Sequence, residues 1–76
     1  MESIKIGKVL NKGQDTEAIV LAQKYDYYRS GYIVLCLIPS RKEFVTWWTN
    51  LDVECPVSGN YHYTLEDAMK DYRLRD

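Results

Sequence analysis

The sequence predicts a small α+β domain: an antiparallel sheet of four to five short strands with one C-terminal amphipathic helix packed on one face. Two adjacent segments, residues 32–38 and 43–50, are rich in β-branched and aromatic residues, as strands are. Residues 65–74 follow a capping residue and repeat apolar positions with a helical period. The chain has 76 residues, so we expect a single domain over residues 1–76 with one core.

The first predicted element is a short edge strand over residues 4–10, where Ile4, Ile6 and Leu10 are the apolar positions. A turn is predicted over residues 11–15, because Asn and Asp tolerate the left-handed region and Gly13 permits a positive φ.

Residues 16–25 are compatible with two structures. Asp15 could cap a helix whose apolar face includes Ala18 and Leu21. The β-branched pair Ile19 and Val20, together with the turn before it, favours a strand that pairs back on the first one. We prefer the strand and leave the helix open.

The middle of the chain predicts a hairpin. After a turn over residues 26–31, residues 32–38 form an uninterrupted apolar run, which is typical of a central strand covered on both faces. A break at residues 39–42 separates it from the strand predicted over residues 43–50. Residues 51–60 are expected to form a loop, the most probable site of disorder, and residues 61–63 a brief strand.

The C-terminal helix has the clearest local signals. Thr64 is a favourable N-cap, and Asp67 stands at the third helical position as in a variant capping box. The residues spaced for one apolar stripe against the sheet are Leu65, Ala68, Met69 and Tyr72. The solvated outer face is expected to carry Glu66, Asp67, Lys70 and Arg73.

Composition excludes several classes of protein. The net charge of −1 argues against an overall electrostatic footprint for nucleic acid or an anionic membrane. The longest apolar run, residues 33–38, is too short to span a bilayer, and no secretory signal is visible at the N-terminus. We therefore expect a cytoplasmic protein in which Cys36 and Cys55 are free thiols, Cys36 being a small core residue.

No motif predicts catalysis, a metal site or a cofactor. His62 is the only histidine, and the two cysteines have no metal-ligand spacing. A nuclease-like acid–base site could be assembled from His62, Glu43 and Arg41, but no spacing brings the three together. The expectation is a non-enzymatic protein.

The aromatic residues suggest a binding role. Trp47 and Trp48 are adjacent in a predicted strand and so point to opposite faces, whereas one helix covers only one face. The other face is covered either by the N-terminal segment and loops, or by a second subunit or a partner. Base stacking is a further possibility, although nucleic acid is an improbable partner because the flanking charges are mixed. The candidate partner-binding residues are Tyr27, Tyr28, Tyr32, Trp47, Trp48, Tyr61 and Tyr63.

Three parts of the C-terminal half carry a recurrent pattern: the segment Phe44-Val45-Thr46-Trp47, residues 59–63, and the segment Leu65-Glu66-Asp67-Ala68 with Asp71-Tyr72. In these parts the chain resembles small uncharacterised proteins of phages and mobile elements in Gram-positive bacteria. The resemblance implies such an origin, and we expect a host or phage protein as partner. Proteins of this size and origin are often inhibitors of host defences, including CRISPR nucleases.

A second, weaker similarity is to the HicB-type antitoxin domain, whose sheet is followed by a Thr-Leu-Glu-Glu-Ala helix. Residues 64–68 here match that pattern, whereas the segment after Pro39 lacks the Pro-Gly-Cys pattern of that family. The leading hypothesis is a small protein-binding module, an inhibitor of a host defence complex such as a CRISPR effector, with a homodimer possible. The alternative is a nucleic-acid-binding or antitoxin-like regulatory domain that uses an aromatic sheet face.

Overall fold

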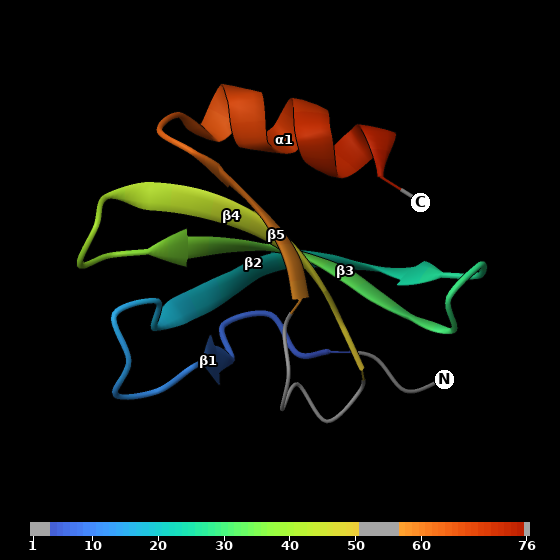
Figure 1. Cartoon of the computed structure of the whole chain (residues 1–76), viewed down its shortest axis with the longest axis horizontal. Coiled ribbons are helices and arrows are strands. Elements are labelled where there is room, and N and C mark those ends of the chain that lie inside the picture. The colour runs from blue at the N-terminus through green and yellow to red at the C-terminus, as the bar shows by residue number, and fades with distance from the viewer. Residues whose placement is uncertain (1–3, 51–56, 76) are drawn as a thin grey trace.

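A computed structural model of the chain describes residues 4–50 and 57–75 (Figure 1). Five antiparallel strands form one curled sheet in the order β1-β2-β3-β4-β5, and one helix follows them. The elements are β1 (Val9–Leu10), β2 (Ala18–Asp26), β3 (Gly31–Ile38), β4 (Glu43–Thr49), β5 (Val57–His62) and α1 (Leu65–Leu74). The predicted α+β class, with one C-terminal helix on an antiparallel sheet, is confirmed.

The centre of the sheet is as the sequence predicts. β3 pairs with β2 on one side and with β4 on the other, and most of its residues are buried. Residues 18–26 are a strand, so the helical alternative for that segment is wrong. The turn before it contains Asn11 and Gly13 with positive φ of 53° and 83°, as expected for residues that tolerate that region.

The first strand is shorter than predicted. Only Val9 and Leu10 pair as a strand with β2, because Gly7 adopts a φ of 90° and turns the preceding segment. The amide of Gly7 donates to the carbonyl of Val20 at 2.7 Å, so the turn still lies against the edge of β2. Residues 4–8 are therefore a coil attached to the sheet rather than an extended strand.

The predicted loop over residues 51–60 is wrong at its end, because β5 begins at Val57 and runs to His62. Gly59 explains how a polar segment fits there: a Cβ at this position would lie 2.5 Å from Nε1 of Trp47. The missing side chain therefore lets Trp47 pack on the backbone of the neighbouring strand. The expected disorder falls on residues 51–56, which lie outside the described residues.

The two faces of the sheet are covered by different elements. One, which we call the N-terminal face, is closed by the segment before β2, since Ile4 and Leu10 are both buried in its core. Of the two coverings that the sequence left open, the N-terminal segment is the one observed. Trp47 belongs to this core, which consists of Ile4, Leu10, Ala18, Val20, Val34, Cys36, Ile38, Val45 and Trp47.

The opposite face, which we call the helix face, lies under α1 (Figure 1). The helix has its predicted bounds, and the Oγ1 of Thr64 accepts from the amide of Asp67 at 3.2 Å, as expected of the cap. The predicted apolar stripe is confirmed only in part: Ala68 is buried and Tyr72 is half-buried, while Leu65 and Met69 remain 43% and 39% exposed. The helix is rotated so that Asp71 faces the sheet instead.

Candidate functional site

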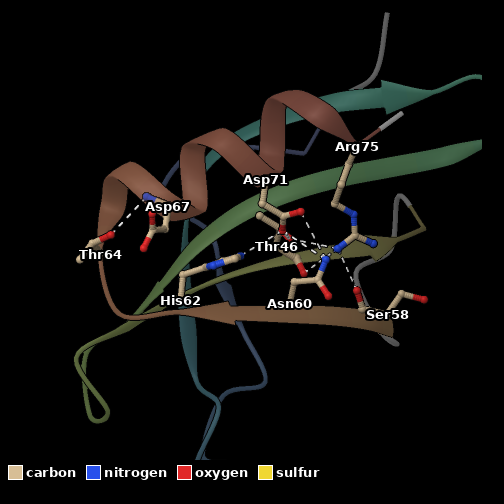
Figure 2. A network of polar contacts seen from close by, with 8 residues as sticks. All are labelled: Thr46, Ser58, Asn60, His62, Thr64, Asp67, Asp71 and Arg75. Atoms are coloured by element: carbon tan, nitrogen blue, oxygen red, sulfur yellow. Dashed lines mark hydrogen bonds and ion pairs between the residues drawn. The ribbon is translucent and has the colours of Figure 1, made fainter.

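A network of polar side chains centred on Asp71 joins α1 to β4 and β5 (Figure 2). The Thr46 hydroxyl, which is fully buried, donates to Oδ2 of Asp71 at 2.6 Å. The Asn60 amide donates to the same oxygen at 3.2 Å, and Nε2 of His62 lies 3.1 Å from it. Burial acts to raise the pKa of Asp71, but the hydrogen bonds from Thr46, His62 and Asn60 outweigh it, so this pKa is lowered.

Arg75, at the C-terminal end of the helix, completes the network. One guanidinium nitrogen donates to the carbonyl of Thr46 at 3.1 Å, to its Oγ1 at 3.0 Å and to the carbonyl of Ser58 at 2.8 Å. Burial lowers the pKa of Arg75, and the nearby charge of Asp71 acts in the opposite direction. The helix is therefore held to two strands by directional bonds at Asp71 and at Arg75.

This geometry fits helix attachment better than acid–base chemistry. The Thr46 hydroxyl proton is directed at Asp71, so His62 is not placed to activate that hydroxyl as a base activates a nucleophile. The trio considered from the sequence is not brought together either. Arg41 pairs with Glu43 at 3.4 Å, whereas His62 pairs with Asp71 on the helix face.

The candidate binding residues fall into three groups, of which the tryptophans are one. Trp47 is 3% exposed, so it is a core residue and offers no surface to a partner, contrary to its prediction as a partner-binding residue. Trp48 is half-buried on the helix face, where its indole covers Gly31. Adjacent tryptophans do point to opposite faces, and each packs on a glycine of a neighbouring strand.

The second group lies at the turn between β2 and β3. Tyr27 and Tyr28 are 83% and 87% exposed. The ring of Tyr25 makes edge-to-face contacts with Tyr27 at 4.8 Å and with Tyr32 at 5.4 Å between centroids. We call Tyr25, Tyr27, Tyr28 and Tyr32 the tyrosine tip. Sequence reasoning missed Tyr25 as a candidate, although it stands directly before the predicted turn that carries Tyr27 and Tyr28.

A buried carboxylate holds the backbone of the tyrosine tip. Asp26 is 1% exposed, and its Oδ1 accepts from the amides of Tyr28 at 2.9 Å and Arg29 at 3.3 Å. Ser30 then turns the chain into β3 with a φ of 55°. Aspartate side chains commonly stabilise tight turns in this way, so the exposed rings are carried on a defined backbone.

The third group, Tyr61 and Tyr63, lies at the end of β5 next to the start of the helix. Tyr61 packs edge-to-face on Trp47 at 6.3 Å, and the Arg41 guanidinium lies 5.9 Å above its ring. Tyr63 is 82% exposed. In Figure 1 this end of β5 is at the opposite end of the molecule from the β2–β3 turn, so the exposed tyrosines form two separate groups.

Metal and thiol chemistry find little support in residues 4–50 and 57–75. No three His, Cys, Asp or Glu side chains in that part of the chain are grouped so that they could hold a metal ion. Cys36 is a free thiol in the core, as expected, and burial raises its pKa to about 12. Cys55 lies outside the described residues.

Comparison with known proteins gives no relative. No protein-family model matches the chain, and neither a curated protein nor a solved structure matches it. Among the described residues, no helix has both the length and the apolar character needed to cross a membrane. The candidate site therefore rests on the geometry of the molecule itself.

Proposed function

We propose that this chain is a small non-enzymatic protein-binding module that uses the tyrosine tip as its anchor. The observation that carries the proposal is the exposure of Tyr27 and Tyr28 on a turn whose backbone is fixed by buried Asp26. Tyrosine rings give a large contact area for little loss of side-chain freedom, and they are enriched among the residues that dominate binding energy. A rigid turn lowers the entropy lost on association.

We also propose an origin and a target for this module. The resemblance of the C-terminal half to small phage and mobile-element proteins supports an inhibitor of a bacterial host defence complex, such as a CRISPR effector, acting in the host cytoplasm. The small size of the domain fits a blocking role, because such a protein needs a surface and no catalytic centre.

Affinity capture with matched variants tests the binding role. Tagged wild-type chain, the double variant Tyr27→Ala/Tyr28→Ala and the control Tyr63→Ala are used to capture proteins from bacterial lysates. We expect a protein that the wild type and Tyr63→Ala capture and the double variant loses, since Tyr63 is as exposed but lies at the other end. Equal capture by all three proteins would contradict a role for the tyrosine tip.

The proposed inhibition of a host defence complex needs a separate experiment. Phage plating is measured on bacteria that carry an active CRISPR effector and on matched bacteria without it, each expressing the wild type or the double variant. Restoration of plating by the wild type only, and only where the effector is present, is the expected result. If plating does not change with any effector type tested, the chain does not inhibit these CRISPR effectors. That result would not contradict the protein-binding role.

A nucleic-acid-binding role is the second candidate, because Arg29 adjoins the exposed rings of Tyr27 and Tyr28 and aromatic rings can stack on bases. Titration of labelled single- and double-stranded oligonucleotides at low salt decides it. Binding that weakens steeply with salt and is lost in the double variant would favour this role over protein binding.

A further inference from the structure

Exposed charge is unevenly distributed along the sheet. Among the described residues, the exposed carboxylates lie in the β1–β2 turn and in the first turn of α1, which share one end of the molecule in Figure 1. These are Asp15, Glu17, Glu66 and Asp67. The β2–β3 turn and the end of α1 lie at the other end, so the tyrosine tip is remote from all four.

Cationic groups gather near the tyrosine tip. Arg29 follows Tyr28 directly in the turn, and its side chain is 55% exposed. Lys24 lies on β2, its ammonium 4.9 Å from the centre of the Tyr72 ring. Arg75 is close enough for the charge of Arg29 to contribute to lowering its pKa. Of these three positive groups, Arg29 lies in the turn that carries the tyrosine tip, whereas the contacts of Lys24 and Arg75 place them on the adjoining helix face.

Of the carboxylates near these cations, Asp26 is buried and Asp71 is partly buried, and both are committed to internal bonds. Oδ1 of Asp26 accepts two turn amides, and its Oδ2 lies 3.8 Å from Nε of Arg29. Asp71 accepts from the helix-face network. Asp26 presents no exposed negative charge and Asp71 is only 21% exposed, so the described surface beside Tyr27 and Tyr28 is aromatic and carries the positive charge of Arg29. Glu2, Asp52, Glu54 and Asp76 lie outside the described residues.

A surface of this kind is complementary to carboxylates that lie beside apolar side chains. A polynucleotide requires a row of cations along its backbone, because affinity grows with the number of phosphates neutralised. Here Arg75 is already bonded to two strand carbonyls, and the whole chain has a net charge of −1. A short acidic protein segment needs only one or two charge pairs at the rim of the aromatic contact.

We propose that the tyrosine tip and Arg29 bind an acidic segment of the partner protein, in which Asp or Glu side chains alternate with apolar ones. The rings of Tyr27 and Tyr28 bury the apolar side chains, and the Arg29 guanidinium donates to a carboxylate at the edge of the contact. This inference rests on the proposed function, because it names the chemistry of the partner at the same surface.

Selection from a random peptide library displayed on phage tests the inference without a known partner. The library is selected on immobilised wild-type chain and depleted on the double variant Tyr27→Ala/Tyr28→Ala. We expect the enriched peptides to be acidic and to contain apolar residues. Enrichment of neutral or basic peptides would overturn the acidic segment but keep the protein-binding role. The absence of any tyrosine-dependent peptide would overturn both.

A charge-reversal variant of Arg29 gives a second test, in which the affinity for the tightest-binding acidic peptide is measured. Arg29→Glu should weaken its binding about fivefold or more, because it replaces one rim attraction by a repulsion. Lys12→Glu makes the same change in charge at an exposed position in the β1–β2 turn and should leave binding unchanged. Equal weakening by both variants would show a general charge effect and overturn the assignment to Arg29.

Two further measurements exclude other occupants of the surface. Tighter binding of a single-stranded oligonucleotide than of the peptide, lost in both the double variant and Arg29→Glu, would overturn the inference in favour of nucleic acid. A dimer in sedimentation experiments that becomes a monomer in the double variant would assign the surface to a second copy of the chain. A monomer in both proteins, together with acidic peptide binding, is the expected result.

Discussion

The two faces of this sheet are closed by different kinds of interaction. On the N-terminal face, aliphatic side chains and Trp47 pack against Ile4 and Leu10 in an apolar core. On the helix face, Ile33 and Leu35 of β3 are buried, but Ala68 is the one fully buried residue of α1, and the helix is also held by the bonds that Asp71 and Arg75 make to β4 and β5. Apolar burial supplies most of the folding free energy, whereas hydrogen bonds fix one orientation.

The two faces of the sheet therefore have different structural roles. Among the described residues, the N-terminal face, with nine buried apolar residues against Ile33, Leu35 and Ala68 on the helix face, should contribute more of the folding free energy. The helix face sets how the helix is rotated, even though this leaves Leu65 and Met69 partly in solvent. Three substitutions and one acid titration test this distinction, with expected effects that decrease from the first to the last.

Trp47→Ala should have the largest effect, a loss of about 3–5 kcal/mol in the free energy of unfolding, because it leaves a large cavity in the apolar core. Urea denaturation followed by circular dichroism measures the loss. The matched control is Trp48→Ala, the same change one residue away on the half-buried helix face, which should cost less. A greater loss from Trp48→Ala would reverse the comparison of the two faces.

Asp71→Ala should cost about 1–3 kcal/mol, because the buried hydroxyl of Thr46 loses its acceptor and the contacts from Asn60 and His62 are lost with it. Hydrogen exchange should show the helix amides opening more often while the amides of β3 stay protected. Lys70→Ala, at an exposed position of the same helix, is the control and should be close to neutral. Uniform loss of protection across the sheet would argue against a local role.

Thr64→Ala should cost about 1 kcal/mol, because the amide of Asp67 loses the hydroxyl that accepts from it. Thermal unfolding monitored by circular dichroism is sufficient to detect this loss. Thr64→Ser keeps a capping oxygen and should retain most of the stability. If both variants lose the same amount, the cap does not contribute through its hydroxyl.

The smallest expected effect is on the dependence of stability on pH. The pKa of Asp71 is lower in the folded chain than its ordinary value of 3.8, so its contribution is present above that value and is lost as the pH falls below it. Asp71→Asn cannot titrate at this position. The stability of the wild type should thus fall more steeply than that of Asp71→Asn in acid, as measured by urea denaturation across this range. Parallel curves for the two proteins would contradict the lowered pKa.

The features that local patterns encode were predictable from the sequence. The apolar run of β3, the β-branched and aromatic character of β4 and the cap at Thr64 each specify their element without reference to the rest of the chain. The short first strand was not anticipated, because alternation continues through Gly7 while its positive φ ends the extended conformation.

Features that depend on distant partners were not predictable. Asp71 faces the sheet because Thr46, 25 residues earlier, donates to it, and helical periodicity alone favours Leu65 and Met69 as the inward residues. The predicted brief strand over residues 61–63 overlaps the end of β5. Its start at Val57 was missed because the fit of Trp47 against Gly59 depends on the pairing of the strands. In the candidate site, Tyr27 and Tyr28 were chosen correctly as surface residues, whereas burial of Trp47 depends on the N-terminal segment.

The Asp26 turn has a consequence for how this domain can change over generations. The carboxylate that shapes the turn is buried, while the rings that it displays at Tyr27 and Tyr28 contribute almost nothing to the core. Mutations at the two rings can therefore be sampled without loss of folding, so selection can act on recognition separately from stability. A domain built in this way can follow a changing target by altering two codons, while the scaffold beneath them stays constant.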